Sequence, residues 1–182
     1  MLNFPKDRSI HRPLHLYLPE PAYYFISSRT YGGLAYFRDE LKKEILLKVI
    51  FEKIREFEFS LSGWVVLNNH YHLLLKAENG IDLAKLISQV NGKSSYLLNK
   101  IENRKGRKIW YQYWDKIVSD EKSFYCHLNY IHQNPIKHNL IKNLDELVGY
   151  QFCSYKDYLK KFGQDWLDDC FANYPIIDYI KE

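Results

Sequence analysis

Two histidines flank one bulky residue inside an apolar stretch, His70-Tyr71-His72, which is followed by three leucines. If this stretch is a β-strand, alternate side chains point to the same face and the two imidazoles lie side by side. Neutral imidazoles held in this way can occupy two ligand positions of a divalent metal ion. The alternative is that both histidines only satisfy local hydrogen bonds, and the triplet by itself favours neither interpretation.

A second candidate cluster lies about sixty residues later, on a predicted helix that contains Tyr130 and Asn134. Residues four apart share a helix face, so we expect the phenol and the amide to lie together, with His127 close beside them. A phenol with a pKa near 10 is a poor nucleophile at neutral pH, but a neighbouring divalent ion can polarise a phosphate for its attack. The alternative, which the spacing alone favours, is that Tyr130 packs in the core and Asn134 caps the helix before Pro135.

A basic segment followed by clustered aromatic residues lies between these two regions. Six lysines and arginines occur from position 93 to 108, against one acid, and residues 110–114 contain four aromatic residues. Proteins bind single-stranded nucleic acid with positive charge for the backbone and flat rings for the bases. A solvated helix end followed by core aromatics is the alternative, but four rings in five residues are hard to bury together. The candidate DNA-contacting residues are Arg29, Lys93, Lys100, Arg104, Lys105, Arg107, Lys108, Trp110 and Tyr113. Arg29, in the first predicted strand, is equally compatible with being a solvated arginine.

The composition predicts one domain and argues against a membrane protein or a secreted disulfide scaffold. A chain of 182 residues that is 46% apolar can bury a core, yet it has no apolar run long enough to span a bilayer. Residues 1–8 lack a signal-peptide core, and three cysteines are typical of a protein in a reducing cytoplasm. The net charge is +4, although two basic and five acidic residues follow position 160. We therefore predict a moderately basic domain over residues 1–160 and an acidic, aromatic tail over residues 161–182.

Hydrophobic periodicity predicts the elements that must position these groups. The order is β-α-β-β-α-β followed by a further helix, which is typical of an α+β, ferredoxin-like split β-α-β fold with an antiparallel sheet. In this fold we expect the helices to cover one face of the sheet and to leave the other face available for a site. The predicted strands are 22–29, 59–67, 70–76 and 114–119, and the predicted helices are 38–56, 82–103, 120–134 and a short one that begins near 152.

The two clusters together resemble a known family. His70-Tyr71-His72 is similar to the HUH motif, and Tyr130-Ile131-His132-Gln133-Asn134-Pro135 resembles the tyrosine motif of single-tyrosine HUH transposases. Within that group, the chain looks like a REP-associated tyrosine transposase, with similarity from Tyr24 to about Tyr158. The residues after the tyrosine motif, 137–139, differ from the small residues and glycine that are usual in the branch. We expect this difference to affect DNA contacts or loop shape rather than the chemistry.

The resemblance implies an activity and assigns roles to residues. The family acts on single-stranded DNA, often on hairpins formed by palindromes, as a metal-dependent endonuclease and strand transferase. It implies that Tyr130 is the nucleophile that forms a 5′-phosphotyrosine link. It also implies that Mg²⁺ or Mn²⁺ is held by His70, His72 and Asn134. The protein would then work in the bacterial cytoplasm, at the nucleoid, as a monomer or a homodimer.

Several roles stay open at this point. His127 is a candidate for proton transfer, whereas we expect His132, on another side of the same helix, to be structural or at the surface. Two other functions compete with transposition. One is a domesticated relative that binds single-stranded hairpins without cutting them, and the other is a metal-dependent phosphodiesterase in which water attacks in place of Tyr130.

Overall fold

The four strands of the computed structural model form one antiparallel sheet in the order β2-β3-β1-β4. The structure describes residues 21–78 and 82–176, so the prediction about residues 1–8 lies outside the described residues. Two crossover helices join the strands as in a ferredoxin-like fold, which confirms the predicted fold class. The strands are β1 (Ala22–Thr30), β2 (Ser60–Val66), β3 (His70–Ala77) and β4 (Trp110–Val118).

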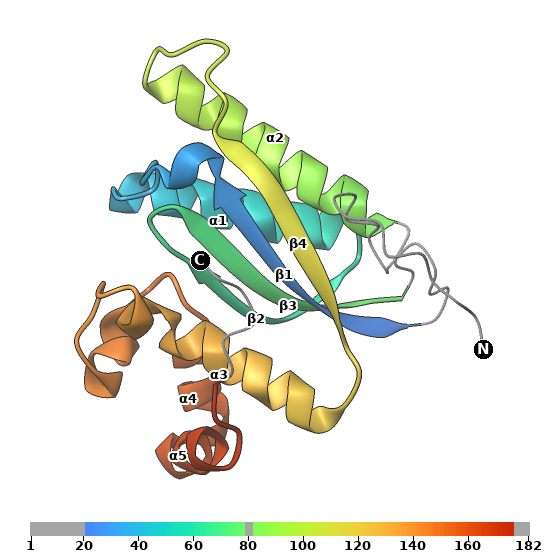
Figure 1. The fold of residues 1–182 in the computed structure, drawn as a ribbon, viewed down its shortest axis with the longest axis vertical. Coiled ribbons are helices and arrows are strands. Elements are labelled where there is room, and N and C mark those ends of the chain that lie inside the picture. Colours follow the sequence, from blue (N-terminus) through green and yellow to red (C-terminus); the bar gives the residue numbers. More distant parts are fainter. Residues whose placement is uncertain (1–20, 79–81, 177–182) are drawn as a thin grey trace, which may run out of the picture.

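Helices lie on both faces of this sheet (Figure 1). Helices α1 and α2 pack on one face, and α3 packs on the other, with α4 and α5 beyond it. The expectation of an uncovered second face was therefore wrong, because apolar side chains such as Phe25, Val65 and Leu74 occupy that face and need to be buried. The helices are α1 (Glu40–Glu56), α2 (Leu83–Ile101), α3 (Glu121–Lys137), α4 (Tyr155–Phe162) and α5 (Gln164–Asn173), with short 3₁₀ helices η2 (Tyr31–Gly33) and η4 (Leu144–Gly149).

A glycine in β2 lets helix α3 lie close to the sheet. A Cβ atom at Gly63 would lie 2.9 Å from Cδ1 of Leu128 and 3.5 Å from Cδ1 of Ile131. Any side chain here would push against α3, so the missing Cβ sets how near the helix approaches. The close approach matters for the site, because α3 carries Tyr130 and Asn134 toward β3.

Helix α3 begins as predicted but continues past its proline. The Asp120 carboxylate accepts a hydrogen bond of 2.7 Å from the backbone N–H of Ser123 and so caps the first turn. Pro135 cannot donate to the carbonyl of Ile131, which instead lies 3.9 Å from the Cys153 thiol as acceptor. The helix therefore extends to Lys137, and the chain leaves it at Asn139, whose φ of 54° is the left-handed conformation common after a helix end.

Strand β4 begins at Trp110, earlier than the predicted start at residue 114. The extra residues continue the ladder with β1, in which Thr30 pairs with Trp110 after a β-bulge. The backbone N–H of Tyr31 also donates to the carbonyl of Ile109 at 2.7 Å. This pairing turns the Trp110 ring inward, with consequences for the predicted DNA-binding residues.

The described part of the acidic tail includes α5, which contacts α3. The side-chain N–H groups of Asn129 donate to the carbonyls of Cys170 and Tyr174, both at 2.8 Å. Leu167 is buried in the apolar cluster between the sheet and α3, and Cys170 is also buried. The contact joins the end of α5 to the middle of the helix that carries the candidate nucleophile.

Candidate active site

Strand β3 places both histidines on the sheet face that α3 covers. His70 and His72 alternate with Tyr71, so their rings share one face while the Tyr71 ring joins the core on the other. The two imidazole centroids lie 5.0 Å apart, and both residues are buried. Because β3 is a central strand paired on both sides, the two imidazoles have a rigid backbone beneath them.

Asn69 orients the ring of His70. The Nδ1 atom of His70 donates to Oδ1 of Asn69 at 2.7 Å, and Nδ2 of Asn69 donates to the carbonyl of Gly33 at 3.0 Å. With Nδ1 protonated in this way, the lone pair of the neutral ring is on Nε2. A neighbour that fixes the tautomer and the ring orientation is typical of histidines that bind metals.

Helix α3 contributes an amide oxygen opposite that lone pair. Oδ1 of Asn134 lies 3.3 Å from Nε2 of His70, while Nδ2 of Asn134 donates to the Tyr130 carbonyl at 3.4 Å. If the His70 ring is neutral, both facing atoms are acceptors, whereas a doubly protonated ring would donate from Nε2 to the amide oxygen. Two ligands about 2.1 Å from the same Mg²⁺ at right angles lie about 3 Å apart, and this spacing fits the observed pair.

Tyr130 lies directly beside these groups. Its ring centroid is 5.3 Å from that of His72, with the planes at 70°, and 5.8 Å from that of Phe25. The residue is 1% exposed. The structure therefore brings together the imidazole pair of the hairpin and the phenol and amide of a distant helix.

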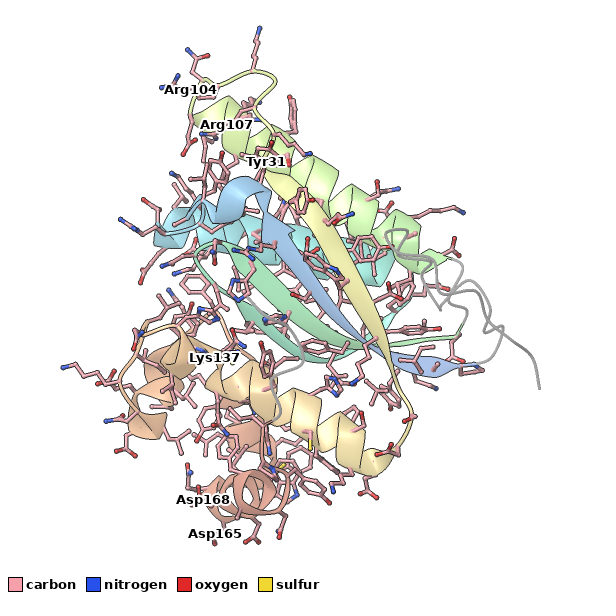
Figure 2. All side chains as sticks on the ribbon, in the orientation of Figure 1. Tyr31, Arg104, Arg107, Lys137, Asp165 and Asp168 are labelled. Atoms are coloured by element: carbon pink, nitrogen blue, oxygen red, sulfur yellow. The ribbon has the colours of Figure 1, made fainter. Side chains whose placement is uncertain are left out.

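Lys137 adds a positive charge at the phenol. Its Nζ donates to the Tyr130 hydroxyl at 3.3 Å and lies 4.8 Å from the ring centroid. Lys137 is labelled in Figure 2. The sequence reasoning did not include this lysine in the site. Its position seven residues after Tyr130 was the available signal, because residues two helical turns apart share a face.

Helix α3 carries two more histidines, and both are buried and neutral. Burial lowers the pKa of His127 to about 4 and that of His132 to about 3. Nδ1 of His127 donates to the Ser123 carbonyl at 2.6 Å, one turn earlier. General bases work best with a pKa near the working pH, so a pKa this low argues against proton transfer by His127 at neutral pH.

His132 connects helix α3 to the edge of the sheet. The Ser154 hydroxyl is hydrogen-bonded to Nε2 of His132 at 3.1 Å, and its oxygen accepts the backbone N–H of Trp64 at 3.1 Å. The ring is also edge-on to Tyr155 and Tyr158. These contacts give His132 a structural role in the interior rather than a place at the surface.

Trp110 lies in the core, so it cannot be a base-stacking residue. It is 7% exposed, stacks on Phe37 at 5.1 Å, and donates from Nε1 to the Ser94 hydroxyl at 2.9 Å. Tyr113 is half-buried against the same core. The correction follows from the early start of β4, which points one ring of the aromatic run inward and leaves its neighbour, Tyr111, exposed.

The predicted basic residues divide into engaged and exposed groups. Lys93 pairs with Glu52 at 2.6 Å, and Arg107 pairs with Glu102 and lies over the Tyr36 ring. Arg29 is half-buried and is the cross-strand neighbour of His70. The remaining residues, which project to solvent at the α2–β4 end of the molecule, are Lys100, Arg104, Lys105 and Lys108.

The rest of the described chain offers no competing metal site. Among residues 21–78 and 82–176, no group of three or more His, Cys, Asp or Glu side chains could hold a metal ion. The candidate metal site therefore depends on the amide of Asn134 as a third ligand. In the same residues we find no helix with the length and apolar character that crossing a membrane requires.

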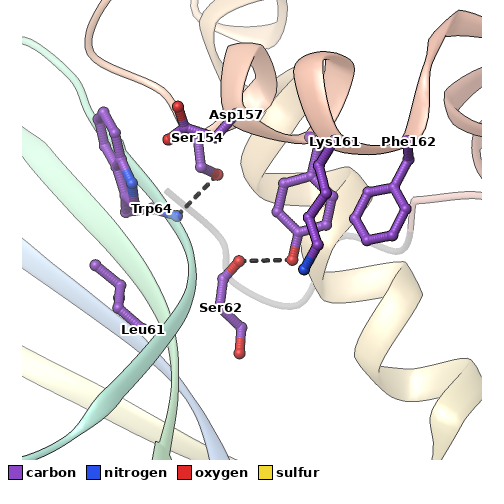
Figure 3. Close-up of a pocket in the computed structure, with 8 residues that line it drawn as sticks. Leu61, Ser62, Trp64, Ser154, Asp157, Lys161 and Phe162 are labelled. Carbon is purple, nitrogen blue, oxygen red and sulfur yellow. Dashed lines mark hydrogen bonds between the residues drawn. The ribbon is translucent and has the colours of Figure 1, made fainter.

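A cavity of about 320 Å³ lies away from the site, between β2 and α4 (Figure 3). Its lining includes Trp64, Ser154 and Lys161, and the Tyr158 hydroxyl donates across it to the Ser62 carbonyl at 2.7 Å. None of the candidate ligands or the candidate nucleophile lines this cavity. It therefore adds nothing to the chemistry of the site.

Comparison with known proteins places this geometry in a family. A REP-associated tyrosine transposase of Escherichia coli (strain K12) is 25% identical over 105 residues, which are 57% of this chain and 60% of that protein. The chain thus matches about 60% of the length of this curated relative. The fold is similar to that of a REP-associated tyrosine transposase bound to a REP hairpin, with a TM-score of 0.61 and 18% identity over 88% of each chain.

A putative transposase from Deinococcus radiodurans gives a lower TM-score of 0.47, with 17% identity over 68% of this chain and 91% of that one. The family described as "Transposase IS200 like" matches residues 29–134. That segment is more than half of the chain, and it contains both candidate histidines, Tyr130 and Asn134. The chain therefore belongs to the IS200-like transposase family.

Proposed function

We propose that this protein is a metal-dependent single-stranded DNA endonuclease and strand transferase that acts through a 5′-phosphotyrosine intermediate. The observation that carries the proposal is that the four residues lie together. The Tyr130 ring contacts His72, the His72 ring contacts His70, and His70 contacts the amide of Asn134. These groups come from a hairpin and from a helix far along the chain. The 3.3 Å contact between Nε2 of His70 and Oδ1 of Asn134 supports the proposal, because both atoms are oxygen or nitrogen donors that a metal ion can bind once the imidazole is neutral.

His70, His72 and Asn134 would hold the metal ion. Two imidazoles and an amide oxygen suit a divalent cation, and an ion such as Mg²⁺ keeps its other positions for water and phosphate oxygens. Bound Mg²⁺ or Mn²⁺ supplies positive charge that stabilises the scissile phosphate as negative charge develops on it. Asn69 would keep the His70 ring in the orientation and tautomer that ligation requires.

Tyr130 would carry out the covalent step. Its oxygen forms a bond to phosphorus while the bond from phosphorus to the 3′ oxygen breaks. The phenol loses its proton, and the departing 3′ oxygen gains one. The ammonium of Lys137, 3.3 Å from the phenol oxygen, would stabilise the negative charge that this oxygen acquires before attack.

The covalent link explains why strand transfer needs no external energy source. Each cleavage exchanges one phosphodiester for another, so a free 3′-hydroxyl can reverse the reaction on a new end. A hydrolytic enzyme would lose that energy to water. The close contacts of Tyr130 with His72 and Lys137 favour attack by the phenol over attack by water.

Hairpin or palindromic single-stranded DNA is the proposed substrate. The related REP-associated transposase was solved bound to a REP hairpin, and the present chain shares its fold. The exposed lysines and arginines at the α2–β4 end suit a DNA backbone, since they carry positive charge and project to solvent.

The test is formation of a covalent protein–DNA adduct. The protein is incubated with end-labelled hairpin DNA that carries single-stranded flanks, with Mn²⁺ or with EDTA, and is then denatured and separated by size. We expect an adduct with Mn²⁺ that is absent with EDTA and absent from Tyr130→Phe. Cleavage without an adduct would favour a phosphodiesterase, and binding without cleavage would favour a hairpin-binding protein. An adduct that persists in Tyr130→Phe would refute the assigned nucleophile.

A further inference from the structure

Three side chains form an exposed aromatic and basic cluster at the sheet end that carries His70. The rings of Tyr31 and Tyr111 lie 6.1 Å apart, and Nζ of Lys108 lies 4.6 Å from the first and 5.6 Å from the second. Tyr31 is 47% exposed and Tyr111 is 54% exposed. We call this group the tyrosine platform.

A β-bulge in β4 turns Tyr111 outward. Ser28 pairs with Tyr113 and Thr30 pairs with Trp110, so Tyr111 and Gln112 both lie opposite a single residue of β1. Trp110 and Tyr113 on either side pack against the α1–α2 core, whereas Tyr111 and Gln112 are exposed. Bulges of this kind often re-aim side chains beside active sites. The Tyr111 ring therefore lies outside the apolar core.

Hydrogen bonds connect the platform to the candidate metal ligand. The N–H of Thr30 donates to the carbonyl of Asn69 at 2.8 Å, and the Asn69 side chain bridges the Gly33 carbonyl and the His70 ring. In the sheet register Arg29 lies opposite His70, so Tyr31 lies roughly 7 Å further along the strand direction. The platform is therefore close enough to the site to share one DNA strand with it.

Arg29 continues the surface between the platform and the site. A Cβ atom at Gly33 would lie 3.0 Å from the guanidinium nitrogen Nη2 of Arg29, so the glycine leaves room for this cation beside the turn. The φ of Gly33 is also positive, at 66°, which favours glycine at this position. The Arg29 guanidinium therefore lies beside the turn that follows Tyr31, on the strand position that pairs with His70.

The charge around the platform selects a polyanion over a protein partner. Four of the five residues from 104 to 108 are basic, and Arg104 and Lys105 are exposed. Arg104 lies at the same end of the molecule as Tyr31 (Figure 2). Aromatic rings interleaved with cations are the usual surface for unpaired bases. A protein partner is less well matched to this surface, because three of these cations are exposed and protein interfaces are depleted in lysine.

We infer that Tyr31 and Tyr111 stack on unpaired bases of the single-stranded segment next to the hairpin, with Lys108 and Arg29 on its phosphates. This inference rests on the proposed function and names the residues that receive the single-stranded flank. In this inference Tyr31 and Tyr111, which are exposed, take the base-stacking role that the sequence had suggested for Trp110 and Tyr113. It also predicts that hairpins without a single-stranded flank do not use the platform.

The experiment measures binding rather than cleavage. All variants carry Tyr130→Phe, and the DNA is a hairpin with a single-stranded flank that contains 2-aminopurine at successive positions, compared with the same hairpin without the flank. In Tyr31→Ala and Tyr111→Ala we expect about tenfold weaker binding of the flanked hairpin and no change for the hairpin alone. We also expect the stacking signal of 2-aminopurine to be lost.

Three matched variants separate stacking from other causes. Tyr31→Phe and Tyr111→Phe keep the ring and should keep both affinity and signal. Tyr96→Ala removes another exposed tyrosine, 63% exposed on α2, and should change neither. Unchanged binding of the flanked hairpin by the two alanine variants would overturn the inference. The same result is expected if the two rings bind a protein partner instead of DNA. Absence of DNA binding by the parent protein would overturn the proposed function itself, so the two failures are distinguishable.

Discussion

The two faces of strand β3 differ in what they contribute to the protein. Tyr71, Leu73 and Leu75 enter an apolar core beneath α1 and α2, whereas His70 and His72 face α3 together with Leu74. The residues alternate along one strand, so the same backbone supports both faces. One face supplies packing, and the other combines packing with the candidate chemistry.

Two buried tyrosines make the contrast sharper. Tyr71 is 0% exposed and donates its hydroxyl hydrogen to Oδ1 of Asn91 at 3.0 Å, and burial raises its pKa. Tyr130 is 1% exposed but has the Lys137 ammonium at its hydroxyl and an imidazole beside its ring. The two tyrosines are equally buried. The Lys137 ammonium beside the hydroxyl distinguishes Tyr130, the candidate nucleophile, from Tyr71, a structural phenol.

The largest effect is expected from the face that α3 covers. In His72→Gln we expect adduct formation to fall about a thousandfold, because a metal-bound phosphate is worth several kcal/mol to the transition state. The measurement is the initial rate of adduct formation with Mn²⁺. Tyr71→Phe, one residue away on the opposite face, should retain the rate of the parent protein. An equal loss in both variants would mean that the two faces do not have separate roles.

The next effect tests the opposite face. Leu73→Ala removes a fully buried side chain from the α1–α2 core and should lower the free energy of unfolding by about 3 kcal/mol. Urea denaturation followed by circular dichroism measures this loss. The fraction that stays folded should form the adduct at the parent rate. A change in metal dependence in this variant would contradict the assignment of this face to packing alone.

Stability should also fall with acid, through the buried histidines of α3. His132 has its pKa lowered to about 3 by burial, so below its ordinary value of 6.5 the unfolded chain binds a proton that the folded chain does not. This residue should therefore cost about 2 kcal/mol of stability between pH 7 and pH 5. His132→Gln keeps an acceptor for Ser154 but does not titrate, and urea midpoints should show a flatter dependence on pH. An unchanged slope would refute the neutral, buried state of His132.

The smallest effect concerns the charge at the phenol. Lys137→Met should slow adduct formation about tenfold, because the cation no longer stabilises the attacking oxygen. Lys137→Arg keeps the charge and should recover most of the rate. Both variants should unfold at the same urea concentration as the parent, since the side chain is exposed. Equal rates for Met and Arg would mean that Lys137 acts through packing rather than charge.

Local periodicity made much of the molecule predictable. Strand alternation placed His70 and His72 on one face, and helical spacing placed Tyr130 and Asn134 on another, before any fold was known. The order of apolar segments also indicated the ferredoxin-like topology, which the structure confirms. These features depend on residues close in sequence, whose geometry is set by the backbone period.

Other features depend on which distant segments pack together, so the sequence could not determine them. Whether an aromatic residue near position 110 is buried or exposed follows from the bulge and from the pairing of Trp110 with Thr30. The facing atoms of His70 and Asn134 meet because Gly63 lets α3 lie close to the sheet. The amino-acid pattern was enough to predict the elements and the chemical groups on each. Which of those groups meet depends on the packing of distant segments, because long-range contacts have no local period.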